Sequence, residues 1–277
     1  MSEFAFIQIT DHHLGEGSGS LRHGFATNYA FFSVLRHIST YTARKADFIL
    51  STGDMIDPPT ESAHRYFSQA LGVQHAATAP GPLHITSQGL QEFPFYMIPG
   101  NHDDRQLMSQ YFFSAGPAFE WMNISFVHQG VQFICIDWGD SPKAAASPGM
   151  LAHLEKSLSS DLPSIIISHH AVTPVGISWL DEFLADDVDS FWYTLVRPQA
   201  RSKVLSILCG HTHLTYEQVK FGIPVLGLRS TSYTFGAQQT PSYTLEPPQY
   251  RLLVIRNGEL VWRIYEVPLP QQGQLEI

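Results

Sequence analysis

The sequence contains little charge and few basic residues. Only 15% of its 277 residues are Asp, Glu, Lys or Arg, and 16 basic residues against 25 acidic ones leave a formal net charge of −9. A protein that binds long nucleic acids by neutralising many phosphates needs a surface rich in Lys and Arg. The charge balance therefore argues against a long nucleic acid as partner.

Cysteines and long apolar runs are also scarce. Cys135 and Cys209 both lie within apolar segments, so we expect small buried thiols and no disulfide framework, which fits a reducing compartment. Because no run of about 18 apolar residues is present, we expect no membrane span. The first residues show no basic stretch followed by an apolar stretch and a cleavage site, so we expect no export signal and a cytoplasmic location.

The composition is otherwise that of an ordinary folded protein. Apolar residues make up 44% of the sequence, and 277 residues suffice for one large α/β domain or two modest ones. We expect a single domain over residues 1–277. Histidine is unusually frequent, with 14 copies against 16 of Lys and Arg together. Most histidines in proteins are surface or packing residues, so only their spacing can show which carry chemistry.

Short apolar segments alternate with helix-like stretches in the first part of the chain. The predicted strands are 4–10, 47–51, 94–98, 124–127, 131–136, 164–168 and 204–209. The predicted helices lie around 27–44, 61–75 and 148–159, the last with Pro148 near its start. Strands and helices therefore alternate up to Gly210.

After Gly210 the pattern changes to strands alone. They are predicted at 214–220, 224–228, 250–255 and 260–267, with Asn257-Gly258 as a strong hairpin signal. An α/β first part and a β-rich second part predict an α/β fold, a four-layer α/β/β/α sandwich in which helices flank two mixed β-sheets. The segments 76–91 and 232–248 stay unassigned. Loops of this length are often functional or else disordered, and we take both as candidate lids.

Five polar clusters each follow directly on a predicted strand. They are Asp11-His12-His13, Gly53-Asp54, Gly100-Asn101-His102-Asp103, Ser168-His169-His170 and Gly210-His211-Thr212-His213. In open α/β sheets ligands bind beyond the carboxyl ends of the strands, so these clusters can converge on one crevice. Each cluster alone has an ordinary explanation as an Asx turn, a helix cap or a tight turn. Their repeated position favours a shared site.

The donor types in these clusters suit a metal. Carboxylate, amide and imidazole groups without thiolate favour Mn, Fe, Co or Zn in a catalytic site over a structural zinc site. Alternate residues of an extended segment point the same way, so Asp11 with His13, and His211 with His213, each bring two donors together. Each pair can hold one ion, or the two pairs can share two ions.

The ordered blocks DHH, GDMID, GNHD, SHH and GHTH resemble those of the calcineurin-like metallophosphoesterases, and they extend from residue 11 to 213. The run GIPVLGLRSTSYTF at 222–235 is similar, less specifically, to the segment after GHxH in class III cyclic nucleotide phosphodiesterases and related glycerophosphodiesterases. The resemblance implies a metallophosphoesterase-like fold and a metal-dependent phosphoric ester hydrolase, a phosphodiesterase.

The resemblance also implies two metal ions, divalent or mixed-valence, drawn from Mn, Fe, Zn and Co. The ligands that it implies are Asp11, His13 and His213 for the first ion, Asn101, His169 and His211 for the second, and Asp54 as the bridge. A hydroxide shared by the two ions would attack phosphorus in line with the departing alkoxide.

His102 is the residue that we predict to protonate or stabilise the leaving oxygen. It follows the implied ligand Asn101, and the unperturbed imidazole pKa of about 6.5 lies close to working pH. Asp103 would orient His102 as carboxylates orient catalytic imidazoles, with a helix cap as the equal alternative.

Other polar residues near the blocks have open roles. Arg22 and His23 either reach the substrate or belong to a solvated loop, and His170 either supports a ligand or contacts the substrate. His12 stands where the family carries a small or hydrophobic residue, and it either packs or donates a hydrogen bond to a ligand, of which we favour packing. Asp57, which completes GDMID, is expected to fix its loop and not to bind metal.

Three functions fit these observations. The first is hydrolysis of small phosphodiesters, either cyclic nucleotides or glycerophosphodiesters, with Tyr233 and Phe235 stacking on a base or packing on the sheet. The second is a phosphomonoesterase or protein phosphatase on the same site. The third is a non-catalytic scaffold, against which the complete ligand set argues. The expected partner is a small phosphoester, and a homodimer through the C-terminal strands stays open.

Overall fold

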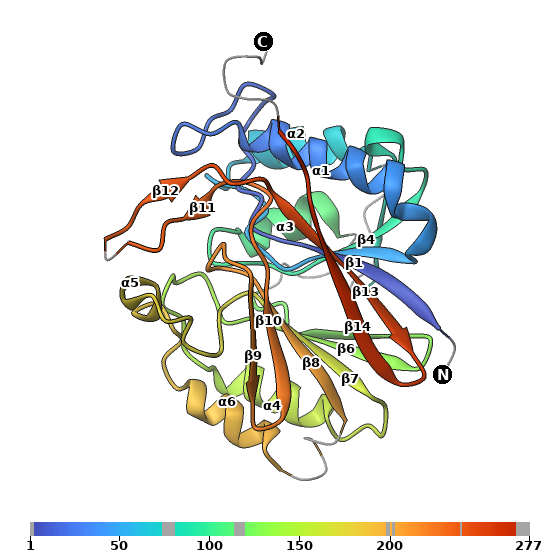
Figure 1. Ribbon diagram of the computed structural model, residues 1–277, viewed down its shortest axis with the longest axis vertical. Helices are drawn as coiled ribbons and strands as arrows, with labels where there is room; N and C mark the ends of the chain where they lie inside the picture. The colour runs from blue at the N-terminus through green and yellow to red at the C-terminus, as the bar shows by residue number, and fades with distance from the viewer. Residues whose placement is uncertain are drawn as a thin grey trace.

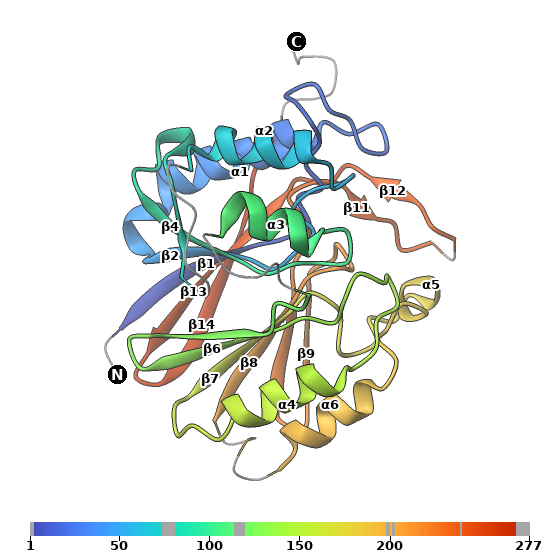
Figure 2. The same cartoon turned by 180° about the vertical axis from the view of Figure 1, so that it is seen from behind.

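Two six-stranded sheets pack face to face, and helices cover the outer face of each sheet (Figures 1 and 2). This computed structural model describes residues 3–73, 81–113, 120–197, 200, 203–238 and 240–269. The arrangement confirms the predicted four-layer α/β/β/α sandwich.

The first sheet joins the beginning and the end of the described chain. Its strand order is β14-β13-β1-β2-β4-β3. The strands are β1 Phe4–Ile9, β2 Phe48–Ser51, β3 Leu83–Ile85, β4 Phe93–Met97, β13 Gln249–Arg256 and β14 Glu259–Glu266. β1, β2 and β4 run parallel, whereas β13 is antiparallel to β1 and places Ile255 opposite Phe4.

The second sheet is built from the middle of the chain in the order β5-β6-β7-β8-β10-β9. Its strands are β5 Ile124–His128, β6 Val131–Ile136, β7 Ser164–Ser168, β8 Val204–Cys209, β9 Tyr216–Lys220 and β10 Ile223–Gly227. The four central strands are parallel and both edge strands are antiparallel. A small ribbon of β11 Thr234–Phe235 and β12 Tyr243–Thr244 projects beyond the sheets (Figure 1).

Helices cover the outer faces and begin where the sequence supplies caps. The helical segments are α1 Thr27–Tyr41, η1 Ala43–Lys45, α2 Glu61–Leu71, η2 Ser87–Gly89, α3 Arg105–Phe112, α4 Pro148–Ser157, α5 Ser178–Asp181 and α6 Val188–Leu195. The side chains of Thr60, Asp104 and Ser147 accept hydrogen bonds from backbone amides in the first turns of α2, α3 and α4. Gly72, in the left-handed conformation, ends α2.

Both faces of the central strands are buried, which explains their almost continuous apolar runs. Phe6 packs in the layer between the two sheets, whereas its neighbour Ile7 faces the helices on the outer side of the first sheet. Each such side chain contributes about 1.5–3 kcal/mol when fully buried. Cys135 and Cys209 are buried free thiols, as predicted, and burial raises the pKa of each to about 12.

The structure also differs from the predicted elements. α3 and α6 are helices that the sequence pattern does not predict, and β3 lies within the first candidate lid, 76–91. Residues 76–80 of that segment lie outside the described part of the chain. Residues 81–91 contain η2 and β3, which is an edge strand of the first sheet. Among the described helices, none is long and apolar enough to cross a membrane.

Candidate metal centre

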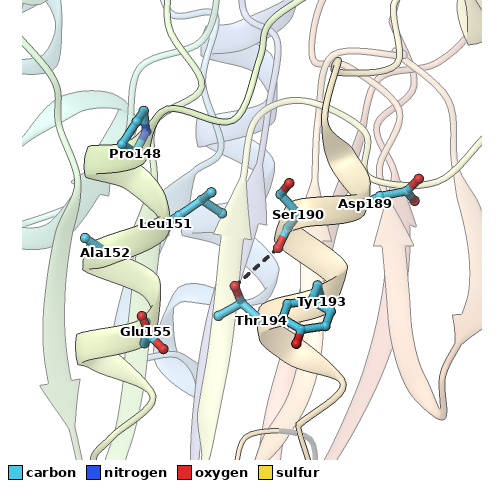
Figure 3. A pocket seen from close by; sticks show the side chains of 8 residues that line it. All are labelled: Pro148, Leu151, Ala152, Glu155, Asp189, Ser190, Tyr193 and Thr194. Carbon is cyan, nitrogen blue, oxygen red and sulfur yellow. Dashed lines mark hydrogen bonds between the residues drawn. The ribbon is translucent and has the colours of Figure 1, made fainter.

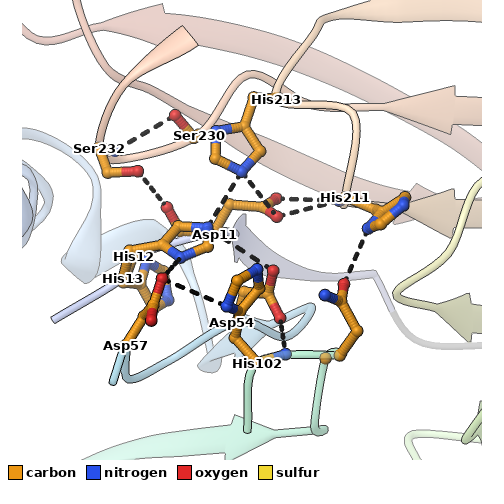
Figure 4. Close-up of polar contacts among 12 residues, drawn as sticks. Asp11, His12, His13, Asp54, Asp57, His102, His211, His213, Ser230 and Ser232 are labelled. Carbon is orange, nitrogen blue, oxygen red and sulfur yellow. Dashed lines mark hydrogen bonds and ion pairs between the residues drawn. The ribbon is translucent and has the colours of Figure 1, made fainter. Parts of the chain in front are cut away.

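The seven predicted metal ligands converge where the parallel strands of both sheets end. They are Asp11 and His13 after β1, Asp54 after β2, Asn101 after β4, His169 after β7, and His211 and His213 after β8. All are buried except His211, which is half-buried. The ends of five strands lie close together, and this brings residues between positions 11 and 213 into one cluster (Figure 4).

The loops that carry these side chains hold one another through their backbones. The amide of Asp11 donates to the carbonyl of Gly53 at 3.0 Å, and the amide of His13 donates to the carbonyl of Asp54 at 3.0 Å. Positive φ angles occur at Asp11 (53°), His13 (47°) and Asp54 (53°), and also at His211 (70°) and His213 (52°). Side chains rarely adopt this left-handed region, and such strain gathers at functional sites.

One group of potential ligand atoms comes from Asp11, His13, Asp54 and His213, all within 4.8 Å of one another. His13 Nε2 lies 3.1 Å from His213 Nε2 and 3.6 Å from Asp54 Oδ2. His213 Nε2 lies 3.4 Å from Asp11 Oδ1. Two atoms that each lie about 2.1 Å from one cation, at roughly 90–110° to each other, are about 3.0–3.4 Å apart. The spacing of this group therefore suits a single cation.

A second group shares Asp54 with the first and adds His169 and His211. His169 Nε2 lies 3.3 Å from Asp54 Oδ2. The amide oxygen of Asn101 completes the group, at 3.1 Å from His169 Nε2 and 2.9 Å from His211 Nδ1. Asp54 therefore belongs to two adjoining sets of donors, which is the position that the family resemblance implies for a bridging carboxylate.

Three of the imidazoles are oriented by acceptors on their outer nitrogens. Nδ1 of His213 lies 2.7 Å from the carbonyl oxygen of Tyr233, and Nδ1 of His169 lies 2.9 Å from that of Thr52. Nδ1 of His13 lies 3.3 Å from Asp57 Oδ2. Such partners fix the tautomer that leaves Nε2 without a proton, which is the form that binds metal.

The charges of the cluster also suit a cation. Burial alone would raise the pKa of Asp11 and of Asp54, but His213 beside the first and His169 beside the second hold the pKa of both carboxyls below their ordinary values. Burial, together with the neighbouring His170 and His169, holds the pKa of His211 well below its ordinary value. Anionic carboxylates and a neutral imidazole are the protonation states that metal binding requires.

His102 has a different carboxylate partner from the predicted one. The two oxygens of Asp103 accept hydrogen bonds from backbone amides, Oδ1 from Met55 at 2.8 Å and Oδ2 from Gly100 at 2.8 Å. The cap of α3 is the next residue, Asp104. Asp103 therefore ties two strand-end loops together and does not take the predicted orienting role, because its acceptor sites are occupied by backbone.

Asp57 is the carboxylate that contacts His102, whereas the sequence predicted only that Asp57 fixes its loop. Its Oδ2 lies 2.7 Å from Arg22 Nη2, 3.2 Å from His102 Nδ1 and 3.3 Å from His13 Nδ1. Burial alone would lower the pKa of His102, but Asp57 and Asp54 outweigh it and raise that pKa to about 9. In the sequence, the position of Asp57 in GDMID, three residues after Asp54, indicates that it lies close to the site. Only the conformation of the loop shows that its side chain points to His102.

The remaining histidines near the site have separate environments. His12 packs against Phe31 at 4.7 Å between ring centres, and its Nε2 lies 2.9 Å from Ser51 Oγ, so it has both a packing contact and a hydrogen-bond partner. His170 is buried with Nε2 3.0 Å from the carbonyl of Ser141, and burial together with His169 lowers its pKa to about 3. His23 stacks on a ring of the β11–β12 ribbon outside the ligand cluster.

A pocket of about 210 Å³ opens onto this cluster. Its floor includes His13, Asp54, Asn101, His102, His211 and His213. Its walls come from the α5 region and from the second candidate lid, 232–248, whereas no described residue of 76–91 lines it. Whether 232–248 moves as a lid stays a prediction.

A larger cavity of about 580 Å³ lies between α4 and α6 on the outer face of the second sheet (Figure 3). It is lined by residues such as Leu151, Glu155, Asp189 and Tyr193, and by no histidine or cysteine. Each group of potential metal ligands found among the described residues has at least two members in the lining of the 210 Å³ pocket. The smaller pocket is therefore the candidate site.

Comparison with known proteins agrees with this geometry. Residues 4–214 match the family model described as calcineurin-like phosphoesterase. The chain is 26% identical to the 3′,5′-cyclic adenosine monophosphate phosphodiesterase CpdA of Vibrio vulnificus, over 93% of this chain and 88% of that protein. It is 24% identical to a "Probable glycerophosphodiester phosphodiesterase GpdQ" of Arcobacter nitrofigilis, over 89% of this chain and 86% of that protein.

Among solved structures, the fold is similar to that of GAP50, the anchor in the inner membrane complex of Plasmodium. The TM-score is 0.59 at 12% sequence identity, and the match covers 99% of this chain and 87% of the other. At this identity the likeness concerns the fold alone.

Proposed function

Because this chain belongs to the calcineurin-like phosphoesterase family, whose members hydrolyse phosphoric esters, we propose that it hydrolyses small phosphodiesters at a centre of two metal ions. The observation that carries the proposal is that Asp54 belongs to two adjoining groups of donors. The relatives named for cyclic AMP and for glycerophosphodiesters support a diester as substrate.

The donor set fits the proposed ions. Imidazole, carboxylate and amide donors suit Mn, Fe, Co or Zn, and no thiolate is present in either group. Two such cations would supply water of lowered pKa and would neutralise charge on the phosphoryl oxygens. The protein's own contribution is to hold these donors in place before the substrate arrives, through the outer contacts of His13, His169 and His213.

His102 is placed to act on the substrate from the pocket floor. Its side chain is 35% exposed, and Asp57 holds its Nδ1 at 3.2 Å. That contact leaves Nε2 to donate a hydrogen bond to a phosphoryl oxygen or to the departing alkoxide. Arg22, on the same oxygen of Asp57, is 35% exposed and adds positive charge beside the site.

The first test combines metal analysis with hydrolysis of bis(p-nitrophenyl) phosphate in the presence of Mn²⁺. We expect two metal ions per wild-type chain. Asn101→Ala should lose metal and most of the rate, because its amide oxygen joins the second group. His102→Ala should retain both ions and lose about 10²–10⁴-fold in rate, the usual contribution of a general acid.

Each other outcome contradicts a specific part of the proposal. A higher rate on p-nitrophenyl phosphate than on the diester would assign a monoesterase. Two bound ions without turnover of any phosphoester would indicate a non-catalytic scaffold, and a wild type that binds no metal would overturn the centre itself.

A second prediction concerns Asp57. Asp57→Asn should reduce kcat/KM for bis(p-nitrophenyl) phosphate by about 10–100-fold and weaken Mn²⁺ binding, because a neutral amide cannot hold His13, His102 and Arg22 as the carboxylate does. Steady-state kinetics and a Mn²⁺ titration measure both effects. Asp161→Asn is the matched control, since Asp161 is fully exposed and pairs only with Lys203. Equal kinetics in the two variants would show that Asp57 has no positioning role.

A further inference from the structure

Among the described residues, none that forms the walls of the pocket carries a charged side chain. Apart from the floor residues, the pocket is lined by two prolines, one leucine and five aromatic residues. The aromatic residues are Trp179, Phe183, Tyr233, Phe235 and Tyr243. Trp179 and Phe183 come from the α5 region and the other three from the segment 232–248, so two distant parts of the chain meet over the site.

This aromatic wall begins at a metal ligand. The ring of Phe235 stacks on the imidazole of His213 with ring centres 4.3 Å apart. Trp179 meets Phe235 edge-on at 5.2 Å, and Tyr243 lies on another side of Phe235 at 5.8 Å. A substrate with its phosphate on the floor would therefore place its alcohol group against these rings.

Neighbouring rings hold the wall in position. His23 stacks on Tyr243 with ring centres 3.7 Å apart and an angle of 12° between the planes. Tyr233 is buried, and its ring contacts both Tyr243 at 5.4 Å and Phe235 at 5.8 Å. A rigid aromatic surface reduces the conformational entropy that is lost when a ligand binds.

The chemistry of this wall distinguishes two kinds of alcohol. A glycerol or ethanolamine group would lose hydrogen bonds to water and find few side-chain partners among these rings. A planar base has an apolar face that can stack on an aromatic side chain, whichever base it is. The relatives include both a cyclic nucleotide and a glycerophosphodiester phosphodiesterase, so their names leave this choice open.

We infer that Trp179, Phe235 and Tyr243 form a subsite for the planar base of the substrate, so that the enzyme prefers nucleotide diesters to glycerol diesters. The inference rests on the proposed phosphodiesterase function and adds the residues that determine specificity. Trp179 is its most direct test, because it lies outside the ligand cluster and in a short helix at the pocket wall.

The experiment compares two substrates with the same cyclic phosphate. One is 3′,5′-cyclic AMP and the other is methyl riboside 3′,5′-cyclic phosphate, which lacks the base. The wild type should show a kcat/KM at least about tenfold higher for cyclic AMP, which matches the contribution of one base–aromatic stack. Trp179→Ala should lower this ratio by about tenfold while changing the rate on the base-free ester little, and Trp179→Phe should restore most of the ratio.

Trp121→Ala is the matched control, because Trp121 is a 42% exposed tryptophan that does not line the pocket. It should keep the wild-type ratio. Equal kcat/KM for the two cyclic esters in the wild type, or faster turnover of glycerophosphocholine than of cyclic AMP, would overturn the base subsite while leaving a phosphodiesterase. Loss of turnover on all these substrates and on bis(p-nitrophenyl) phosphate would instead overturn the proposed function. A ratio unchanged in both Trp179 variants would remove Trp179 from the subsite.

Discussion

Asp54→Asn should bind at most one metal ion per chain and hydrolyse bis(p-nitrophenyl) phosphate about a thousandfold more slowly than the wild type, a loss of about 4 kcal/mol of transition-state stabilisation. Asp54 Oδ2 lies 3.6 Å from His13 Nε2 and 3.3 Å from His169 Nε2, so it is the donor common to both groups. Its Oδ1 accepts the amide hydrogen of His102 at 2.9 Å. Asparagine can keep that hydrogen bond, but it removes the negative charge and one of the two donor oxygens.

The measurement is metal content after exhaustive dialysis, together with steady-state kinetics at saturating Mn²⁺. Asp186→Asn serves as the control, because Asp186 is 63% exposed, pairs with Lys143 and does not line the pocket. A variant that retains two tightly bound ions would show that Asp54 does not join them. A variant that retains the wild-type rate would show that Asp54 has no part in catalysis.

Gly100→Ala should also impair the site, without removing any donor. A Cβ atom on Gly100 would lie 2.1 Å from Asp54 Oδ1 and 2.5 Å from Asp54 N, so the loop after β2 or the loop after β4 must shift. Overpacking of this kind destabilises a protein by about 1–3 kcal/mol. We expect a lower Tm and a loss of activity of at least about 100-fold, since a displacement of about 1 Å at reacting groups has that effect.

Thermal unfolding and bis(p-nitrophenyl) phosphate kinetics measure the two consequences of Gly100→Ala. Gly17→Ala is the matched control. Apart from its two chain neighbours, no described residue has a heavy atom within 4 Å of the position that a Cβ on Gly17 would take, and the backbone of Gly17 is not left-handed. If Gly100→Ala behaved like Gly17→Ala, the close approach of the two loops would not matter for the site.

The ligand cluster could be predicted from the sequence because it depends on a simple property of the fold. Parallel strands end at one side of a sheet, so polar residues that directly follow such strands, as Asp11 follows β1 and His169 follows β7, must come close together. The layers could be predicted for a related reason. Short apolar runs buried on both faces, such as Ile165 to Ile167, are typical of central strands.

The partners of these residues could not be predicted, because they depend on side-chain directions within loops. Asp57 and Asp103 are both carboxylates close to a block, yet one contacts His102 and the other binds backbone amides. The aromatic wall depends on packing between segments far apart in the sequence, since Trp179 meets Phe235. α3 and α6 were not predicted because each is only 8 residues long, which is shorter than the stretch over which a helical period can be recognised.

The position of β13 affects the order in which the protein can fold during synthesis. Every candidate ligand precedes position 214, but β1, which leads into Asp11, has an unpaired edge until residues 249–256 are made and Phe4 meets Ile255. Contacts between such distant residues form slowly, and an uncovered strand edge can pair with another chain. A nascent chain that already carries all its candidate ligands therefore still exposes the edge of β1. The hairpin of β13 and β14, which contains none of these residues, covers that edge and leaves β14 as the edge strand of the sheet.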